Sequence, residues 1–394
     1  MPLYDDALAL APDLVRLRHD LHRFPELGLH LPRTQERVLQ ALDGLPLEVS
    51  QGSALSSVTA VLRGGRPGPA VLLRADMDGL PVIEKAPVPF AADNGAMHAC
   101  GHDLHTTMLA GAAHLLAARR EQLAGDVVFM FQPGEEGFDG AGAMLAEGVL
   151  DAAGRRPVAA YALHVGSAMP HGEFSSRRGP ILAASDALNV TVRGAGGHGS
   201  VPHRAMDPIP AACEMVTALQ TMVTRRFDVF DPVVITVGLL RAGTQRNIIP
   251  ETAHFEATVR TFSAEARSKA ADAAVELIRA VAAAHGLRAE IEYLPGYPVT
   301  VNDTAEADFL ADTVREVFGE ERFRTMANPM PGAEDFSRVL AAVPGSFAWL
   351  GAAPKGTDPD DLPLNHSPYA EFDDAVLPDG AALYAELATR RLAA

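Results

Sequence analysis

The feature that most constrains the fold of this chain is a set of short apolar runs with almost no polar interruption. Such runs form strands buried on both faces, which is typical of a mainly parallel sheet, and the amphipathic segments between them form the covering helices. We therefore predict an α/β fold. The apolar runs are 58–62, 70–73, 127–131, 158–163 and 347–350, and the helices are expected over 10–21, 32–42, 104–123, 308–318 and 373–392.

The stretch from about 183 to 300 has a different order of elements. An alternating strand, a long helix, two strands, a helix and a last strand make the βαββαβ pattern of a complete α+β, ferredoxin-like domain. Because the α/β pattern resumes afterwards, we predict an inserted lid domain at 184–298 between two parts of a catalytic domain, 1–183 and 299–394. The expected lid strands are 187–192, 233–240, 253–261 and 288–293, and the expected lid helices are 208–226 and 264–285.

Composition excludes several classes of partner. The 394 residues carry 33 Lys and Arg against 50 Asp and Glu, and the resulting charge of -17 repels nucleic-acid backbones and anionic bilayers. The N-terminus lacks the basic start of a secretory signal, and no run of roughly 18 apolar residues could span a membrane. The two cysteines are far apart, which favours a reducing compartment, and Cys213 is predicted to be a core thiol. We expect no nucleic-acid partner, no membrane partner and a cytoplasmic location.

A dense group of potential metal ligands lies at 98–105, just ahead of a predicted helix. This segment contains His98, Cys100, His102, Asp103 and His105. A Cys-x-His loop can place a thiolate and an imidazole on one metal ion, with the nearby carboxylate holding the tautomer of the imidazole. The alternative is a helix N-terminus with a buried cysteine and Asp103 as its cap.

Further polar side chains follow other predicted strands. Glu135 and Glu136 come just after the run 127–131, and in an extended segment their side chains would point in opposite directions. One carboxylate could then bind a metal while the other meets the attacking water, as a hydrolase requires. The alternative is a pair of solvated acids in a turn.

Asp76 and His164 also lie at the ends of predicted strands. Ligands in open α/β sheets gather outside the carboxyl ends of strands, so these two side chains, the Cys100 loop and both glutamates are predicted to project from one edge. His366 lies in a long loop after the last strand and, taken alone, is typical of a surface histidine.

The lid contains three candidate residues. His198 lies in a glycine-rich loop that follows a strand but lacks the lysine of a P-loop and the acidic partner of a dinucleotide site. We therefore interpret this loop as a mobile glycine hinge that presents His198. Asn247 and Arg260 flank a predicted strand, where an amide and a guanidinium could hold a carboxylate. The alternative is a turn asparagine and an arginine paired with a nearby acid.

Together, these motifs resemble the M20 family of metal-dependent peptidases and amidohydrolases, in particular its N-acyl amino acid amidohydrolase branch, which includes hippurate and auxin-conjugate hydrolases. The segments that carry the resemblance run in order over nearly the whole chain. They are 74–81, 97–106, 133–137, 163–164, 197–199, 247–250 and 334–336.

The resemblance implies a site with two divalent metal ions. It implies that Cys100 bridges them, that Glu135 is the general base, and that Asp76 supports a ligand from behind. His198, supplied by the lid of a partner subunit in a homodimer or larger homo-oligomer, would stabilise the oxyanion. The remaining ligands would be His102, Glu136, His164 and His366, and the substrate would be bound by Asn247, Arg260 and Gly332.

The chain departs from the wider family at Arg74, where a histidine ligand is usual, so His102 is expected to take over that ligation. The predicted reaction is hydrolysis of the amide bond of small N-acyl amino acids by a metal-dependent enzyme that uses zinc, manganese, cobalt or nickel. Two alternatives stay open: a dipeptidase or aminopeptidase that requires a free α-amine, and a non-enzymatic metal-binding or peptide-binding relative.

Overall fold

The structure is a computed structural model that describes residues 2–394. The chain divides into two compact units, the first comprising 1–181, 301–328 and 338–394 and the second comprising 182–300 and 329–337. The lid boundaries predicted from the sequence were 184 and 298, without the short segment 329–337. Within residues 2–394, no helix combines the length and the hydropathy needed to cross a bilayer.

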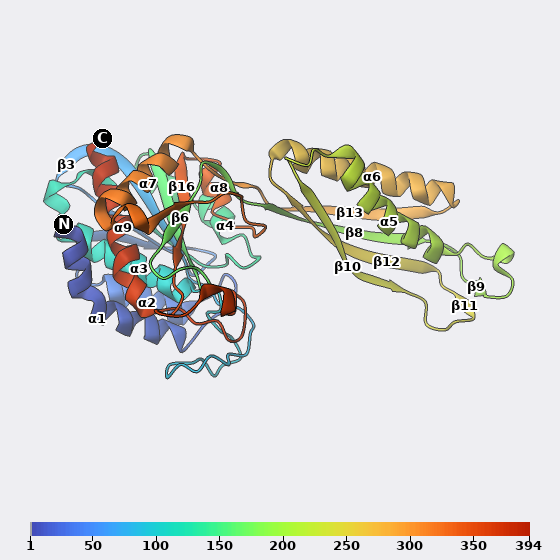
Figure 1. Cartoon of the computed structure of the whole chain (residues 1–394), viewed down its shortest axis with the longest axis horizontal. Coiled ribbons are helices and arrows are strands. Elements are labelled where there is room, and N and C mark those ends of the chain that lie inside the picture. Colours follow the sequence, from blue (N-terminus) through green and yellow to red (C-terminus); the bar gives the residue numbers. More distant parts are fainter. Residues whose placement is uncertain (1) are drawn as a thin grey trace. The chain divides into compact units, whose positions relative to one another are not determined.

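The first unit is built on an eight-stranded sheet whose centre is parallel (Figure 1). The strand order is β1-β2-β4-β3-β5-β16-β6-β15, and β4, β3, β5 and β16 run parallel to one another. The predicted fold class is confirmed. The strands are β1 (Leu47–Gln51), β2 (Val58–Leu62), β3 (Arg66–Asp76), β4 (Ala124–Gln132), β5 (Ala159–Gly166), β6 (Phe174–Ser176), β15 (Phe323–Thr325) and β16 (Gly345–Gly351).

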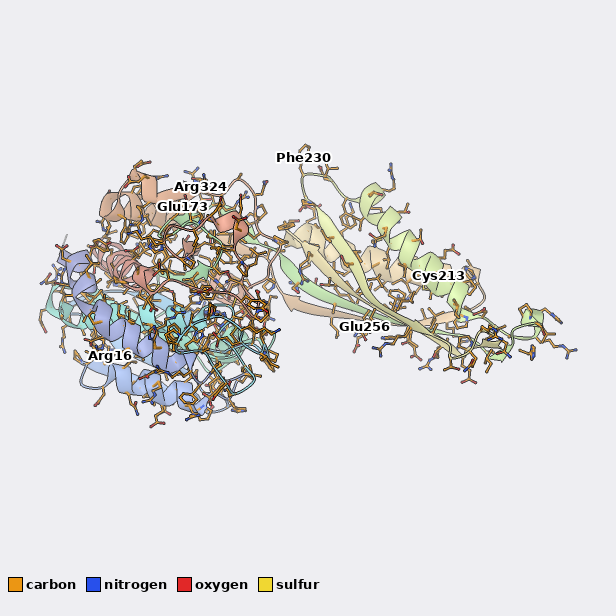
Figure 2. All side chains as sticks on the ribbon, turned by 60° about the horizontal axis from the view of Figure 1, so that its bottom comes forward. Arg16, Glu173, Cys213, Phe230, Glu256 and Arg324 are labelled. Atoms are coloured by element: carbon orange, nitrogen blue, oxygen red, sulfur yellow. The ribbon has the colours of Figure 1, made fainter. Side chains whose placement is uncertain are left out.

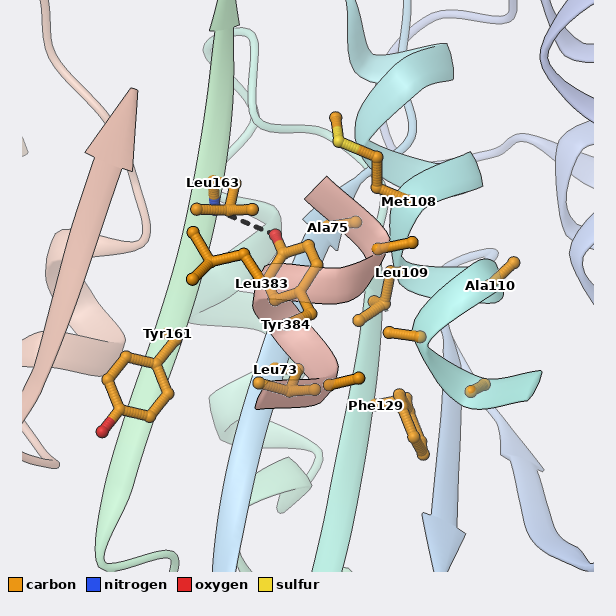
Figure 3. Close-up of a cluster of buried hydrophobic side chains, with 14 of the residues drawn as sticks. Leu73, Ala75, Met108, Leu109, Ala110, Phe129, Tyr161, Leu163, Leu383 and Tyr384 are labelled. Carbon is orange, nitrogen blue, oxygen red and sulfur yellow. Dashed lines mark hydrogen bonds between the residues drawn. The ribbon is translucent and has the colours of Figure 1, made fainter. Parts of the chain in front are cut away.

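The central strands have no solvent-facing side, which explains their uninterrupted apolar sequence. Every residue of β5 and β16 is buried. Helices α1, α3 and α9 pack against one another, and both α3 and α9 lie against β3. In Figure 3, Tyr384 of α9 reaches β5, where its hydroxyl accepts a hydrogen bond from the backbone N–H of Leu163 at 2.9 Å. The helices of this unit are α1 (Pro2–His22), α2 (Pro32–Leu42), α3 (His102–Ala117), α4 (Gly140–Ala146), α7 (Thr304–Phe318) and α9 (Leu377–Ala393).

The second unit has the predicted βαββαβ order. Its four strands are antiparallel in the order β10-β12-β8-β13, and β8 alternates buried and half-buried residues because the helices cover one face of the sheet. Both helices begin with a side-chain cap: Asp207 caps α5 and Ser263 caps α6. The elements are β8 (Ala184–Arg193), α5 (Pro208–Arg226), β10 (Val233–Ala242), β12 (Thr252–Thr261), α6 (Ala264–Ala284) and β13 (Arg288–Tyr297).

Short elements complete the chain. Strands β9 (Gly197–His198) and β11 (Ile248–Ile249) pair with each other, as do β7 (Gly179–Leu182) and β14 (Thr300–Asn302), and α8 (Ser337–Leu340) is a single turn.

Two expectations were wrong in this part of the structure. The helix expected over 104–123 ends at Ala117, and Cys213 is exposed on α5, where Figure 2 labels it, instead of lying in the core.

Candidate metal centre

Cys100 lies at the centre of the predicted ligand set. Its Sγ is 3.5 Å from His164 Nε2 and 3.2 Å from His366 Nε2, although these residues lie 64 and 266 positions away. Gly101 permits this arrangement, since it has a φ of 84° and a Cβ at this position would stand 2.3 Å from a methyl group of Val165. Helix α3 begins directly after this glycine, which places His102 at its first position.

The two glutamates lie in a turn and not in an extended segment as expected. Gly134 and Gly137 have φ values of 73° and 86° and form this turn. The backbone N–H groups of Glu135 and Glu136 both donate to the carboxylate of Asp78, at 3.0 Å each. Asp78 lies two residues after the end of β3. Its carboxylate therefore fixes the backbone of the turn and, with it, the positions of the two glutamate side chains.

The predicted ligands form groups that share members. Each group has one ligand atom per residue, with all of these atoms within 4.8 Å of one another. Cys100 belongs to two of these groups, as a ligand shared by two metal ions would. Glu135 belongs to a third group. The groups are Cys100, His102 and His164; Cys100, Glu136 and His366; and His102, Glu135 and Glu136.

The chemistry of these donors fits a divalent cation. The side chain of His102 is fully buried, and its Nδ1 lies 3.4 Å from Asp78 Oδ1. Its Nε2 makes no hydrogen bond within residues 2–394 and lies 3.7 Å from Asp76 and 4.0 Å from Glu136. A buried ring nitrogen usually has a hydrogen-bond partner, and a bound cation would supply one for Nε2. Thiolate, imidazole and carboxylate ligands together suit zinc, cobalt, nickel or manganese.

The local charges also favour a positive charge at this place. Hydrogen bonds to Cys100 and Glu136 raise the pKa of His366 to about 10. Burial acts to lower the pKa of His102, but Asp76, Asp78 and Cys100 together raise it well above its ordinary value. A divalent cation would be stabilised by the same negative groups.

Asp76 ends β3 and lies behind the ligands. Its Oδ1 accepts a hydrogen bond of 2.5 Å from His105 Nδ1, and its Oδ2 is 2.7 Å from Arg74 Nη1 and 3.7 Å from His102 Nε2. Burial acts to raise the pKa of Asp76, but Arg74, His102 and His105 hold it well below its ordinary range. Arg74, the departure noted in the sequence, therefore keeps this carboxylate charged.

Several supporting residues were not assigned a role from the sequence. His105 donates through Nδ1 to Asp76 and accepts through Nε2 from the backbone N–H of Val165 at 2.8 Å, which fixes its tautomer. Asp78 orients the glutamate turn, and Asn365 bonds to the Cys100 loop. A signal was available for His105, because it lies three positions after His102 and therefore on the same face of α3. Asp103 does not cap α3; its carboxylate binds Arg18 and His22.

The second unit holds His198 and Asn247 close together. His198 pairs with Ile248 between β9 and β11, and the N–H of Gly199 donates to the carbonyl of Asn247 at 2.9 Å. The His198 side chain is exposed. Its Nδ1 accepts the backbone N–H of Ser200 at 3.1 Å, so a neutral ring carries its proton on Nε2 and can donate from there.

Arg260 lies at the opposite end of β12 from this pair. It stands beside Ser185 in the sheet, whereas Thr252, at the Asn247 end, stands beside Arg193. The eight steps along the strand from Thr252 to Arg260 span about 27 Å at 3.4 Å per residue. Within one chain, Asn247 and Arg260 therefore cannot hold the same carboxylate, and the role of each toward a substrate stays a prediction.

The acid nearest to Arg260 is already occupied. The carboxylate of Asp186 is bound by Arg267, by the hydroxyl of Tyr293 at 3.0 Å and by the N–H of Gly296 at 2.9 Å. Arg260 instead donates to Thr258 Oγ1 at 2.5 Å, and its burial lowers its pKa. Gly332 lies in the segment 329–337, where its carbonyl accepts the N–H of Ala183 at 2.8 Å. Its role toward a substrate stays a prediction.

Comparison with known proteins identifies the family. Residues 72–390 match the model of peptidase family M20/M25/M40, and the chain belongs to this family. It is an amidohydrolase, and its clustered His, Cys and Glu side chains are suited to binding divalent metal ions.

Three relatives and one solved structure illustrate the similarity. IAA-amino acid hydrolase ILR1-like 4 of Arabidopsis thaliana is 37% identical over 96% of this chain and 86% of that protein. N-acetylcysteine deacetylase of Bacillus subtilis strain 168 is 35% identical, covering 95% and 96%. Thermostable carboxypeptidase 1 of Saccharolobus solfataricus is 34% identical, covering 98% and 98%. A Bacillus subtilis structure described as a dinuclear metal binding peptidase from family M20 has a TM-score of 0.84 and 31% identity, covering 98% and 99%.

Proposed function

We propose that this enzyme hydrolyses the amide bond of N-acyl amino acids, giving a carboxylic acid and a free amino acid. The observation that carries the proposal is the convergence of Cys100, His102, Glu136, His164 and His366 with Glu135 beside them. Relatives named for the hydrolysis of an indoleacetyl amino acid and of N-acetylcysteine support the substrate class.

The ligand groups support two divalent ions that share the Cys100 thiolate. One would be held with His102 and His164, and the other with Glu136 and His366. Such ions supply Lewis acidity and a lowered pKa for water. Zinc, cobalt, nickel and manganese all match these donors. Cys100 must be reduced to serve as a ligand, which accords with the cytoplasmic location expected from the sequence.

Glu135 is the general base in this proposal. It takes a proton from the water whose oxygen adds to the acyl carbonyl carbon, and it delivers that proton to the amine as the C–N bond breaks. Its backbone N–H is fixed by Asp78, so the turn presents the carboxylate beside His102 and Glu136. Arg260, which has no carboxylate partner among residues 2–394, would bind the carboxylate of the substrate.

The separation of the lid residues supports a homodimer. His198 and Asn247 lie at one end of β12 and Arg260 lies at the other, so these residues serve two different sites. We propose that His198 of one subunit donates from Nε2 to the oxyanion formed in the site of its partner. Within residues 2–394, β10 pairs only with β12, and it exposes Val234 and Leu240 along its free edge, where a second copy could add its own strand.

A substrate panel combined with one variant tests the proposal. The enzyme, loaded in turn with each of the four metals, is assayed on N-acetyl and N-benzoyl amino acids and on unblocked dipeptides. We expect hydrolysis of the acylated substrates and at least a 100-fold loss of kcat in Glu135→Gln, with bound metal unchanged. Faster cleavage of unblocked dipeptides would favour a peptidase, in line with the carboxypeptidase relative, and wild-type turnover in Glu135→Gln would refute the mechanism.

A further inference from the structure

Asn365 occupies a position between three segments that carry metal ligands. It directly precedes His366, and its side chain extends to the Cys100 loop and to the end of β5 beside His164. Neither the sequence motifs nor the mechanism above gives this side chain a role.

The orientation of the Asn365 amide is fixed by a backbone donor on its oxygen side. Oδ1 accepts the backbone N–H of Ser167 at 2.9 Å. The hydroxyl of Ser167 lies 3.0 Å from Oδ1 and 2.8 Å from the carbonyl of Pro363, and its single hydrogen can serve only one of these two oxygens at a time. Because a backbone N–H can only donate, Oδ1 must face Ser167 and the Nδ2 group must face the opposite way, toward the ligands.

The Nδ2 group faces three acceptors. It donates to the carbonyl of Val165 at 2.9 Å, and it lies 3.3 Å from the carbonyl and 3.8 Å from the Sγ of Cys100. One hydrogen serves Val165, and the second is shared by the carbonyl oxygen and the Sγ of Cys100. A donor aimed at a thiolate stabilises its negative charge, since a hydrogen bond to an ionised acceptor is stronger than one between neutral groups.

The Val165 carbonyl links this contact to a second ligand. His164 Nδ1 also donates to that carbonyl at 2.9 Å, which leaves Nε2 unprotonated and directed at Cys100 Sγ. The Asn365 side-chain amide therefore contacts two groups that matter to His164. One is the Val165 carbonyl, which sets the tautomer of the His164 ring, and the other is the Cys100 sulfur, which the ring faces.

The backbone of the third ligand is also held in place. His366 has a φ of 72°, a left-handed conformation that a non-glycine residue rarely adopts, and its N–H donates to the carbonyl of Ala99 at 2.8 Å. Anchoring by the Asn365 side chain on one side and by Ala99 on the other maintains this conformation.

We propose that Asn365 is a positioning residue that donates a hydrogen bond to the Cys100 thiolate and holds the Cys100, His164 and His366 ligands in register. This inference rests on the proposed function, because it requires Cys100 to be a metal ligand. The hydrogen bond lowers the energy of the sulfur lone pair and so tunes how strongly the thiolate donates to a cation.

The test uses the protein loaded with cobalt(II), whose near-ultraviolet thiolate-to-metal band reports directly on the sulfur. We expect this band in the wild type and a shift to longer wavelength in Asn365→Leu and Asn365→Ala, together with a metal affinity about 10- to 100-fold lower in chelator competition. Ser167→Ala is the matched control, because it removes a hydroxyl from the same loop and keeps both the Asn365 donor and the Ser167 N–H. Its band should stay at the wild-type wavelength.

The outcomes separate this inference from the proposed function. If the wild type shows no thiolate band, Cys100 is not a ligand, and both proposals fail. If the wild-type band is present and the folded Asn365 variants leave it unmoved, the positioning role is refuted and the proposed function stands. A second measurement needs no variant: the side-chain amide signal of Asn365 should move when the wild type is loaded with cadmium, and an unmoved signal would refute the contact.

Discussion

The two units hold their candidate residues in opposite ways. In the first unit, Cys100, His102 and His164 are buried and are surrounded by groups with fixed hydrogen bonds, such as the His105 ring between Asp76 and Val165. In the second unit, His198 is exposed, and Asn247 lies in an exposed turn directly before the short two-stranded ribbon of β9 and β11. The first site has its geometry set before any ligand arrives, whereas the second presents single groups that need another surface to act on.

This difference follows from what each group must do. Metal ligands lose affinity when their geometry loosens, so a rigid sheet edge suits them. A donor that completes a site only when substrate is present can be carried on a separate, exposed ribbon. The comparison therefore predicts that changes to the ligands of the first unit affect metal binding, whereas changes in the second unit affect substrate binding or turnover and leave metal binding unchanged.

The largest effect is expected from a comparison of the two cysteines. Cys100→Ser should lower metal affinity by more than the roughly 10- to 100-fold typical of an outer-shell partner, and hydrolysis should fall with it. Cys213→Ser, on the exposed surface of α5, should leave both unchanged. Metal content after dialysis and kcat at saturating metal measure the two effects. Equal metal content in both variants would break the distinction between the units.

His198→Ala should reduce kcat by about 100- to 1,000-fold, as loss of one oxyanion donor does, with metal content unchanged. Mixing this variant with Glu135→Gln then tests whether the residue acts across subunits. Random reassociation of dimers should restore about a quarter of the wild-type sites, because each mixed dimer has one site with both residues intact. No recovery after verified subunit exchange would show that His198 acts within its own chain.

Arg260→Ala should lower kcat/KM by about 10- to 100-fold, mainly through KM, because a substrate carboxylate loses its charged hydrogen bonds. Arg193→Ala is the control, since Arg193 belongs to the same sheet but pairs with Glu290 on an exposed surface. Substrates whose carboxylate is replaced by an amide should be cleaved equally by the wild type and by Arg260→Ala. A KM for the acid substrate that does not change would remove Arg260 from the substrate site.

The sequence predicts the long elements of both units well. Helix α5 has the predicted bounds. Strands β3, β4 and β16 contain predicted runs, and β5 overlaps the run 158–163 from Ala159 on, because strands buried on both faces must be apolar throughout. Strands β6 and β15 were not predicted. Each has three residues, and their pairing with each other brings together segments that lie far apart in the sequence.

The wrong expectations have separate physical causes. Cys213 follows two buried alanines, and such small residues give little indication of which helix face is apolar. The conformation of Glu135 and Glu136 depends on Asp78, a partner 57 positions away that local pattern does not reveal. The distance between Asn247 and Arg260, by contrast, could have been derived from the expected strand length alone. The distances between the metal ligands depend on which strands are neighbours in the sheet. The order of the strands cannot be read from local sequence patterns, so these distances required the structure.

The smallest effect on catalysis, and a clear effect on stability, is expected from the buried ionic group behind the metal centre. Burial acts to lower the pKa of His22, but the Asp103 carboxylate, with Glu84, raises it to about 9. A raised pKa in the folded state means that the stabilisation is complete below the unfolded value of about 6.5 and is lost as the pH rises through about 9. Between pH 7 and 9 this group alone should therefore lower the free energy of unfolding by about 2 kcal/mol.

His22→Gln should remove this part of the slope while kcat near neutral pH stays within a few-fold of wild type. His285→Gln, which changes an exposed histidine of the second unit that pairs with Glu214, should keep the slope. Urea unfolding at several pH values measures it, and a wild-type slope in His22→Gln would show that the pH dependence of stability does not arise behind the metal centre.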